Sequence, residues 1–195
     1  MIIWFAVCVI LYLTNEVQPA DPKYVAVYQD GIQECDDPGS RVMDFSKVTL
    51  VQESASITYI TGDVTINDDI EEGAQVKADV NHEQDGNEEY MFGVLCDICE
   101  EINNTDTPWY PIINGMGINK CPIKKGVYHM DRVSLDISEF DEYMRSDYCG
   151  DYTATIAFLF VPEEGDLLDG GSPLPKILSC HNFAASIFEV GNDDE

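Results

Sequence analysis

The chain has 195 residues, of which 37 are acidic and 10 are basic, and its formal net charge is −27. A surface with this charge repels nucleic acid phosphates, so nucleic-acid binding is excluded as a function. With 45% hydrophobic residues, the chain is also too apolar to be a disordered acidic tail.

The first predicted element is the apolar run MIIWFAVCVILYL at residues 1–13. A membrane-spanning helix needs about 20 apolar residues, whereas the core of a signal peptide needs about 7 to 15. We therefore predict a signal peptide over residues 1–20 and one domain over residues 21–195; an uncleaved anchor is the alternative. The protein should then be secreted and extracellular. The endosomal or lysosomal lumen is a second candidate compartment, because acid pH would relieve part of the charge repulsion.

Cysteine usage agrees with a secreted protein. Cleavage of the signal peptide leaves an even number of cysteines, which indicates disulfides, although six cysteines allow 15 pairings and their spacing does not choose among them. The six are Cys35, Cys96, Cys99, Cys121, Cys149 and Cys180. The one N-glycosylation sequon begins at Asn103, and we predict a surface glycan there.

Most of the remaining chain has the composition of strands, with β-branched and aromatic residues in alternation and turn signals between the runs. The predicted strands are 24–32, 47–54, 55–67, 71–83, 88–95, 127–138, 150–162 and 174–190. Only 97–102 and 109–116 suit short helices. We therefore predict an all-β fold, an immunoglobulin-like antiparallel β-sandwich or β-cup with about eight strands and one or two short helices.

No catalytic, metal or cofactor site emerges from the motifs. Cys96 and Cys99 have a redox or zinc spacing, but a second cysteine pair and a βαβ setting are both missing. His82, His129 and His181 are far apart in the sequence, and there is no nucleophile elbow or His-Glu-x-x-His motif. We expect a protein that is not an enzyme and that uses no cofactor.

One apolar cluster precedes the Cys-Pro step at residue 121. It either packs in the core or forms a lip for an aliphatic ligand or for shallow insertion into a lipid surface, since Trp and Tyr suit a boundary between water and an apolar phase. Its members are Trp109, Tyr110, Ile112, Ile113 and Met116.

Several motifs in the same order resemble the GM2-activator branch of the MD-2-related lipid-recognition (ML) family, especially its secreted insect members of the CheA/CheB type. The resemblance covers about residues 30–190, although members of this branch have eight cysteines and neither Cys96 nor Cys149 has a clear counterpart. The motifs are Cys35-Asp36-Asp37, Cys99 in CDICEEI, Cys121-Pro122 through Gly126-Val127-Tyr128, Gly150-Asp151-Tyr152, and Cys180 followed by Ala184-Ala185-Ser186.

This resemblance implies two sheets that do not close fully and leave an apolar cup for an acyl chain. It implies disulfides between Cys35 and Cys180 and between Cys99 and Cys121, which leaves Cys96 to pair with Cys149. The hydrolase-assisting role of the glycolipid activator is not carried over. The residues that we expect to line the ligand cavity are Val133, Leu135, Ile137, Ile156, Phe158, Phe160, Phe183 and Ala185, with the apolar cluster at the lip.

Lys120, Lys124 and Lys125 gather scarce positive charge beside the expected opening. They either relieve local self-repulsion or contact an anionic headgroup or membrane surface. The first functional hypothesis is a secreted, non-enzymatic protein that binds or transfers a lipid or another long apolar small molecule. The alternative is a secreted interaction or chemosensory accessory protein that acts through its acidic surface without a bound lipid. The sequence identifies no protein partner.

Overall fold

The computed structural model describes residues 24–54, 57–84, 86–107, 109–135, 145–161 and 175–190. These residues form eight strands in two antiparallel sheets, which confirms the predicted all-β class. The predicted signal peptide, Ile137 and the loop at 163–173 lie outside the described residues. The elements are β1 (Tyr24–Glu34), β2 (Met43–Gln52), β3 (Thr58–Ile66), β4 (Ala74–Gln84), β5 (Asn87–Asp97), α2 (Ile98–Glu101), α3 (Tyr110–Gly115), β6 (Gly126–Leu135), η2 (Ser146–Tyr148), β7 (Gly150–Phe160) and β8 (Lys176–Glu189).

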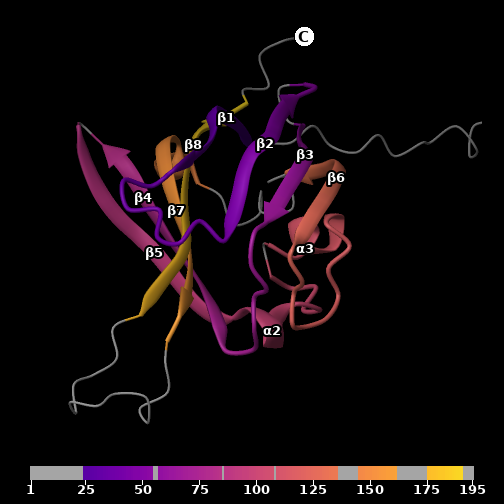
Figure 1. Ribbon diagram of the computed structural model, residues 1–195. Helices are drawn as coiled ribbons and strands as arrows, with labels where there is room; N and C mark the ends of the chain where they lie inside the picture. Colours follow the sequence, from indigo (N-terminus) through magenta and orange to yellow (C-terminus); the bar gives the residue numbers. More distant parts are fainter. Residues whose placement is uncertain are drawn as a thin grey trace, which may run out of the picture.

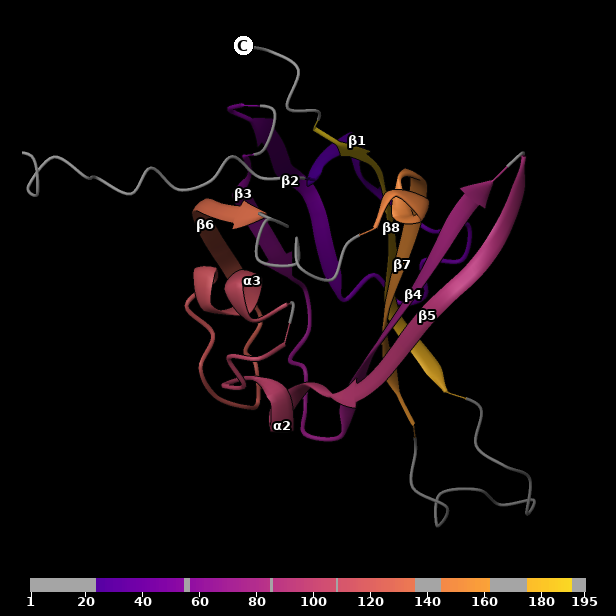
Figure 2. The ribbon, with the colours of Figure 1, turned by 180° about the vertical axis from the view of Figure 1, so that it is seen from behind.

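The two sheets form two layers. The larger sheet has the strand order β1-β8-β7-β4-β5, and the smaller sheet has the order β2-β3-β6. In Figure 1 the layer with β4, β5, β7 and β8 stands opposite the layer with β2, β3 and β6, while α3 lies beside β6 and α2 follows the end of β5. The view from behind shows that the layers diverge toward the tip of the β4–β5 hairpin (Figure 2).

Strand alternation sets which side chains face the opposite layer. In β3, Ile60, Val64 and Ile66 are buried, and an even number of positions separates each from the next. Residues with this spacing lie on the same side of a strand, so β3 has one face on the core. The β4–β5 hairpin turns at Gly86, whose φ of +76° lies in the left-handed region that glycine adopts without steric cost. The hairpin therefore follows directly from the Asp-Gly signal in the sequence.

One side of the sandwich is closed by contacts between β8 and the chain that enters β2. The Val42 amide donates to the carbonyl of Leu178 at 2.8 Å, and the Met43 amide donates to Ser179 Oγ at 2.7 Å. The disulfide between Cys35 and Cys180 lies in the same region. The larger and smaller sheets are thus joined along this seam by hydrogen bonds, while the disulfide ties the end of β1 to β8 within the larger sheet.

A second closure lies at the end of the sandwich that carries α2. Ile70 and Ile123 form an isolated antiparallel bridge with hydrogen bonds of 2.8 and 2.9 Å. The disulfide between Cys99 and Cys121 connects the first turn of α2 to the same segment. Both pairings that the family resemblance implies are therefore present in the structure.

The buried core lies between the layers and under the two short helices. The helix α3 approaches β6 so closely that a Cβ atom on Gly115 would come within 2.3 Å of Val133 Cγ2. Glycine at this position lets the helix rest against the strand. The core residues are Val42, Met43, Ile60, Val64, Ile66, Ile70, Ala74, Val76, Ile98, Ile102, Met116, Ile118, Ile123, Met130 and Val133.

The predicted disulfide between Cys96 and Cys149 is wrong, because both residues are free thiols. Cys96 on β5 lies opposite Val76 of β4, which in turn lies opposite Phe158 of β7. Cys149 precedes Phe158 by nine positions. At about 3.3 Å per residue, the two cysteines are roughly 30 Å apart, far beyond the reach of a disulfide. Burial raises the pKa of the Cys96 thiol, which makes it a weak nucleophile at neutral pH.

Candidate functional site

The strand register places the predicted cavity residues of the larger sheet on one face. Ile156 and Phe158 of β7 lie opposite Ala78 and Val76 of β4. Directly paired residues share a face of the sheet, and Val76 is buried in the core. By the same alternation, Phe160, Phe183 and Ala185 belong to this face. It faces the smaller sheet, since Ser179 on the same face of β8 contacts Met43. We call it the inner face.

The predicted residues of the smaller sheet point toward this inner face. Val133 pairs with the buried Ile60, and Leu135 pairs with Thr58. Val133 is only 8% exposed, whereas Leu135, Ile156 and Phe158 are half-buried and pack against the same core cluster. Phe183 lies farther along β8, with its ring centroid 6.5 Å from that of Tyr28. Part of the predicted lining is therefore core, and part remains accessible.

On the edge strand β5 the inner face becomes more exposed toward the hairpin tip, whereas His82 on β4 is buried and stacks on Tyr152. Along the β4–β5 pair, Val76 opposite Cys96 is 7% exposed, whereas Phe92 opposite Val80 is 58% exposed. We call the four apolar residues Ala78, Val80, Phe92 and Val94 the open strip. Phe92 is exposed, and the other three residues are half-buried. The strip continues the half-buried surface of Ile156 and lies where the layers diverge (Figure 2).

Phe92 and Val94 were not among the predicted cavity residues. A β-bulge explains why the alternation in this segment is hard to interpret. The register shifts between Val80 and Asn81, so that Met91 is an extra residue with no direct partner. An extra residue reverses the inward and outward positions on one side of the bulge.

The predicted apolar lip is divided between the core and the surface. Met116 is 6% exposed and packs in the core, so its assignment to the lip is wrong. Ile112 and Ile113 pack against the same core from α3, because this short helix covers β6. Only Trp109 and Tyr110 remain as half-buried aromatic residues that can form a lip.

The three lysines beside Cys121 are partly engaged by an acidic turn. Lys124 Nζ lies 2.8 Å from Asp69 Oδ2, and the backbone amide of Lys125 donates to Asp69 Oδ1 at 2.8 Å. The hydrogen bond from Lys124 lowers the pKa of Asp69, and the same hydrogen bond raises the pKa of Lys124. This pairing supports the interpretation that the lysines relieve local repulsion. The headgroup or membrane contact stays a prediction.

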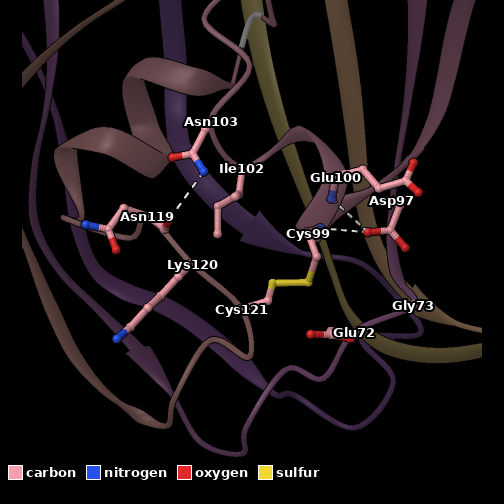
Figure 3. Close-up of a pocket in the computed structure, with 10 residues that line it drawn as sticks. All are labelled: Glu72, Gly73, Asp97, Cys99, Glu100, Ile102, Asn103, Asn119, Lys120 and Cys121. Atoms are coloured by element: carbon pink, nitrogen blue, oxygen red, sulfur yellow. Dashed lines mark hydrogen bonds between the residues drawn. A yellow bond between two sulfur atoms is a disulfide. The ribbon is translucent and has the colours of Figure 1, made fainter.

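Lys120 lies instead on a pocket of about 480 Å³ near the Cys99–Cys121 disulfide (Figure 3). Asp97 caps α2 at one side of this pocket by accepting hydrogen bonds from the amides of Cys99 at 2.7 Å and Glu100 at 3.1 Å. The remaining lining residues are Glu72, Gly73, Ile102, Asn103 and Asn119. None of the predicted cavity residues lines this pocket.

Comparison with known proteins adds no identification. No protein-family model matches the chain, and no curated protein matches it. The assignment to the ML family therefore stays a proposal that depends on the sequence motifs and on the geometry.

A second pocket of about 280 Å³ lies at the seam between the sheets. His181 lines it, is only 5% exposed, and has its ring centroid 4.7 Å from that of Phe45 in an edge-on contact. Its buried Nε2 has no hydrogen-bond partner among the described residues. Glu34 of β1 and Asp44 of β2 also line this pocket and face the imidazole.

Burial of this histidine should make stability depend on pH. Burial lowers the pKa of His181 below 6.5, although Glu34 and Asp44 oppose the shift. A lowered histidine pKa stabilises the fold above the unfolded pKa, and this contribution is lost as pH falls below about 6.5. We expect the urea midpoint of the wild type to fall more between pH 7.5 and 5.5 than that of His181→Gln. Urea unfolding at the two pH values measures the difference.

The exposed His129, which lies 2.8 Å from Asp63, provides the matched control. His129→Gln removes a histidine on the surface and leaves the buried pocket at His181 unchanged. The lowered pKa of Asp44, caused by hydrogen bonds from Ser46, affects stability only below about pH 4 and does not enter this window. Equal pH dependence in the wild type and His181→Gln would contradict the assignment.

Among the described residues, the acidic, histidine and cysteine side chains do not gather into a metal site. No group of three or more His, Cys, Asp or Glu residues that could hold a metal ion is present among them. His82 stacks on Tyr152 at 4.6 Å, and it lies apart from His129 on β6 and His181 on β8. Within the same residues, no helix is long and apolar enough to cross a membrane.

Proposed function

We propose that this chain is a secreted, non-enzymatic protein that binds or transfers a lipid or another long apolar molecule between its two sheets. The observation that carries the proposal is the open strip, where Phe92 is 58% exposed beside the half-buried Val80 and Val94. Exposed apolar patches on a soluble protein mark binding sites more often than isolated apolar residues do. The strip also borders the half-buried Ile156 and Phe158 of the inner face.

The energetics of burial suit a ligand of this kind. Removing each methylene of an aliphatic chain from water contributes about 0.8 kcal/mol. A 16-carbon chain can therefore contribute on the order of 10 kcal/mol before the costs of ordering and association. Binding of this type needs no catalytic group. A neutral or weakly charged ligand suits the chain better than a strongly anionic one, because the formal net charge is −27.

The sequence resemblance to the ML family supports the same function. The Cys35–Cys180 and Cys99–Cys121 disulfides are the two pairings that the resemblance implies. One links the end of β1 to β8 within the larger sheet and the other lies at the α2 end, both away from the hairpin tip. The hairpin end is left without a disulfide among the described residues and can admit a ligand.

A fluorescence titration tests the proposal. We expect the neutral probe N-phenyl-1-naphthylamine to bind saturably with one site and to be displaced by a long-chain fatty alcohol. A linear, non-saturating increase in fluorescence would contradict the proposal. It would favour the alternative, in which the protein acts through its acidic surface and binds no lipid.

A further inference from the structure

The predicted glycosylation sequon borders the pocket at the Cys99–Cys121 disulfide. Asn103 and Thr105 are both exposed, and they lie in the turns that follow α2. The amide of Asn104 donates to the carbonyl of Glu101 at 2.9 Å, and the amide of Thr107 donates to the carbonyl of Asn104 at 3.3 Å. The acceptor asparagine and the hydroxyl residue of the sequon are thus held on the surface by short-range hydrogen bonds.

The side chain of Asn103 is oriented along the pocket wall. Its Nδ2 donates to the carbonyl of Asn119 at 3.3 Å, and the two residues lie side by side at the pocket (Figure 3). An amide nitrogen carries two hydrogens. One can keep the bond to Asn119 while a sugar replaces the other, so a linked sugar begins at the mouth of this pocket.

The pocket offers both kinds of contact that an N-acetylhexosamine uses. The edge of the otherwise buried Ile102 and the Cys99–Cys121 disulfide line the pocket, where an acetamido methyl group can contact them. Glu72 and Lys120 supply polar groups that can pair with sugar hydroxyls. The pocket has a volume of about 480 Å³ and is open toward solvent, as the first sugar of a longer glycan requires.

We propose that Asn103 carries an N-linked glycan whose first N-acetylglucosamine occupies this pocket. In the secretory pathway, Nδ2 forms a bond to C1 of a polyprenyl-diphosphate-linked oligosaccharide. The C1–O bond to the diphosphate breaks, the diphosphate leaves with the electron pair, and Nδ2 loses one proton. Like the proposed function, this glycan requires that the chain pass through the secretory pathway. It does not depend on whether the protein binds an apolar ligand.

The test uses protein secreted from a eukaryotic host that makes high-mannose glycans. Endoglycosidase H trims the glycan to the single N-acetylglucosamine on Asn103. We expect a nuclear Overhauser effect between the acetamido methyl group and the methyl groups of Ile102. We also expect this form to melt about 2–4 °C above Thr105→Ala, which loses the glycan but keeps the Asn103 side chain.

Thr105→Ser is the matched control, because Asn-x-Ser is still an acceptor sequence. It should be glycosylated, and after trimming it should have the same melting temperature as the trimmed wild type. An unmodified Asn103 in the secreted protein would overturn the proposal. Absence of the Overhauser effect to Ile102 would also overturn it, whatever the melting temperatures. That effect is observed in the wild-type chain, so the test holds even if Thr105→Ala folds poorly.

Discussion

Replacing Cys35 and Cys180 together by serine should lower the free energy of unfolding by about 5 kcal/mol. The two cysteines are 145 residues apart in the sequence, and their disulfide therefore closes most of the described chain into one loop. A cross-link over a longer loop removes more entropy from the unfolded chain. Urea unfolding of the double variant, compared with the wild type at pH 7.5, measures the loss.

The second disulfide provides the internal control. Cys99 and Cys121 are only 22 residues apart, so their joint replacement by serine should cost about 3 kcal/mol. The difference between the two double variants tests the contribution of loop length. A smaller loss for the Cys35–Cys180 pair than for the Cys99–Cys121 pair would contradict the expected dependence of the stabilisation on loop length.

Replacing Ala78 by tryptophan should weaken binding of the naphthylamine probe at least tenfold, which corresponds to about 1.4 kcal/mol. Ala78 lies on the inner face between Ile156 of β7 and Val94 of β5. A bulky side chain there would occupy the space that an apolar ligand needs beside the open strip. The fluorescence titration described above gives the dissociation constants.

The control is Ala157→Trp on the neighbouring strand. Ala157 lies opposite Lys77 and Cys180, on the other face of the same sheet. This variant should keep its affinity within about twofold. Phe92→Glu adds a second test, because Phe92 is 58% exposed and its replacement leaves the buried core unchanged. Full affinity in both Ala78→Trp and Phe92→Glu would exclude the open strip as the ligand site.

Local patterns in the sequence predicted most of the strands, because the larger sheet is built from alternating segments with clear turns. The segment predicted at 174–190 corresponds to β8, which spans Lys176–Glu189. The start of β2 was placed too late, at residue 47. The strand begins at Met43 because Met43 pairs with Ile66 of β3, beyond a register shift between Asp44 and Lys47 that local alternation does not reveal.

The candidate site was predicted less completely than the fold. Alternation identified Ile156 and Phe158 as a pair on one face, and the register places both on the inner face. It missed Phe92, because the bulge at Met91 breaks the alternation in β5. The predicted disulfide between Cys96 and Cys149 was wrong for a related reason. Elimination among cysteines takes no account of strand register, which separates these two by most of the length of a strand.

The glycan and the apolar ligand would occupy opposite ends of the molecule. The pocket near Asn103 lies beside α2, whereas the open strip extends toward the tip of the β4–β5 hairpin (Figure 1). A hydrated glycan at the α2 end would disfavour close approach of Lys120 to a membrane. If the protein meets a lipid surface, we therefore expect the hairpin end to approach it.

Native mass spectrometry of the protein purified from a secretory host, without detergent, tests the central claim most directly. We expect an additional mass of a few hundred daltons, bound one per chain, which disappears after organic extraction and is recovered in the organic phase as a long-chain apolar molecule. A protein that carries no such mass, and that fails to acquire one from added fatty alcohol, would contradict the claim that its two sheets hold an apolar ligand.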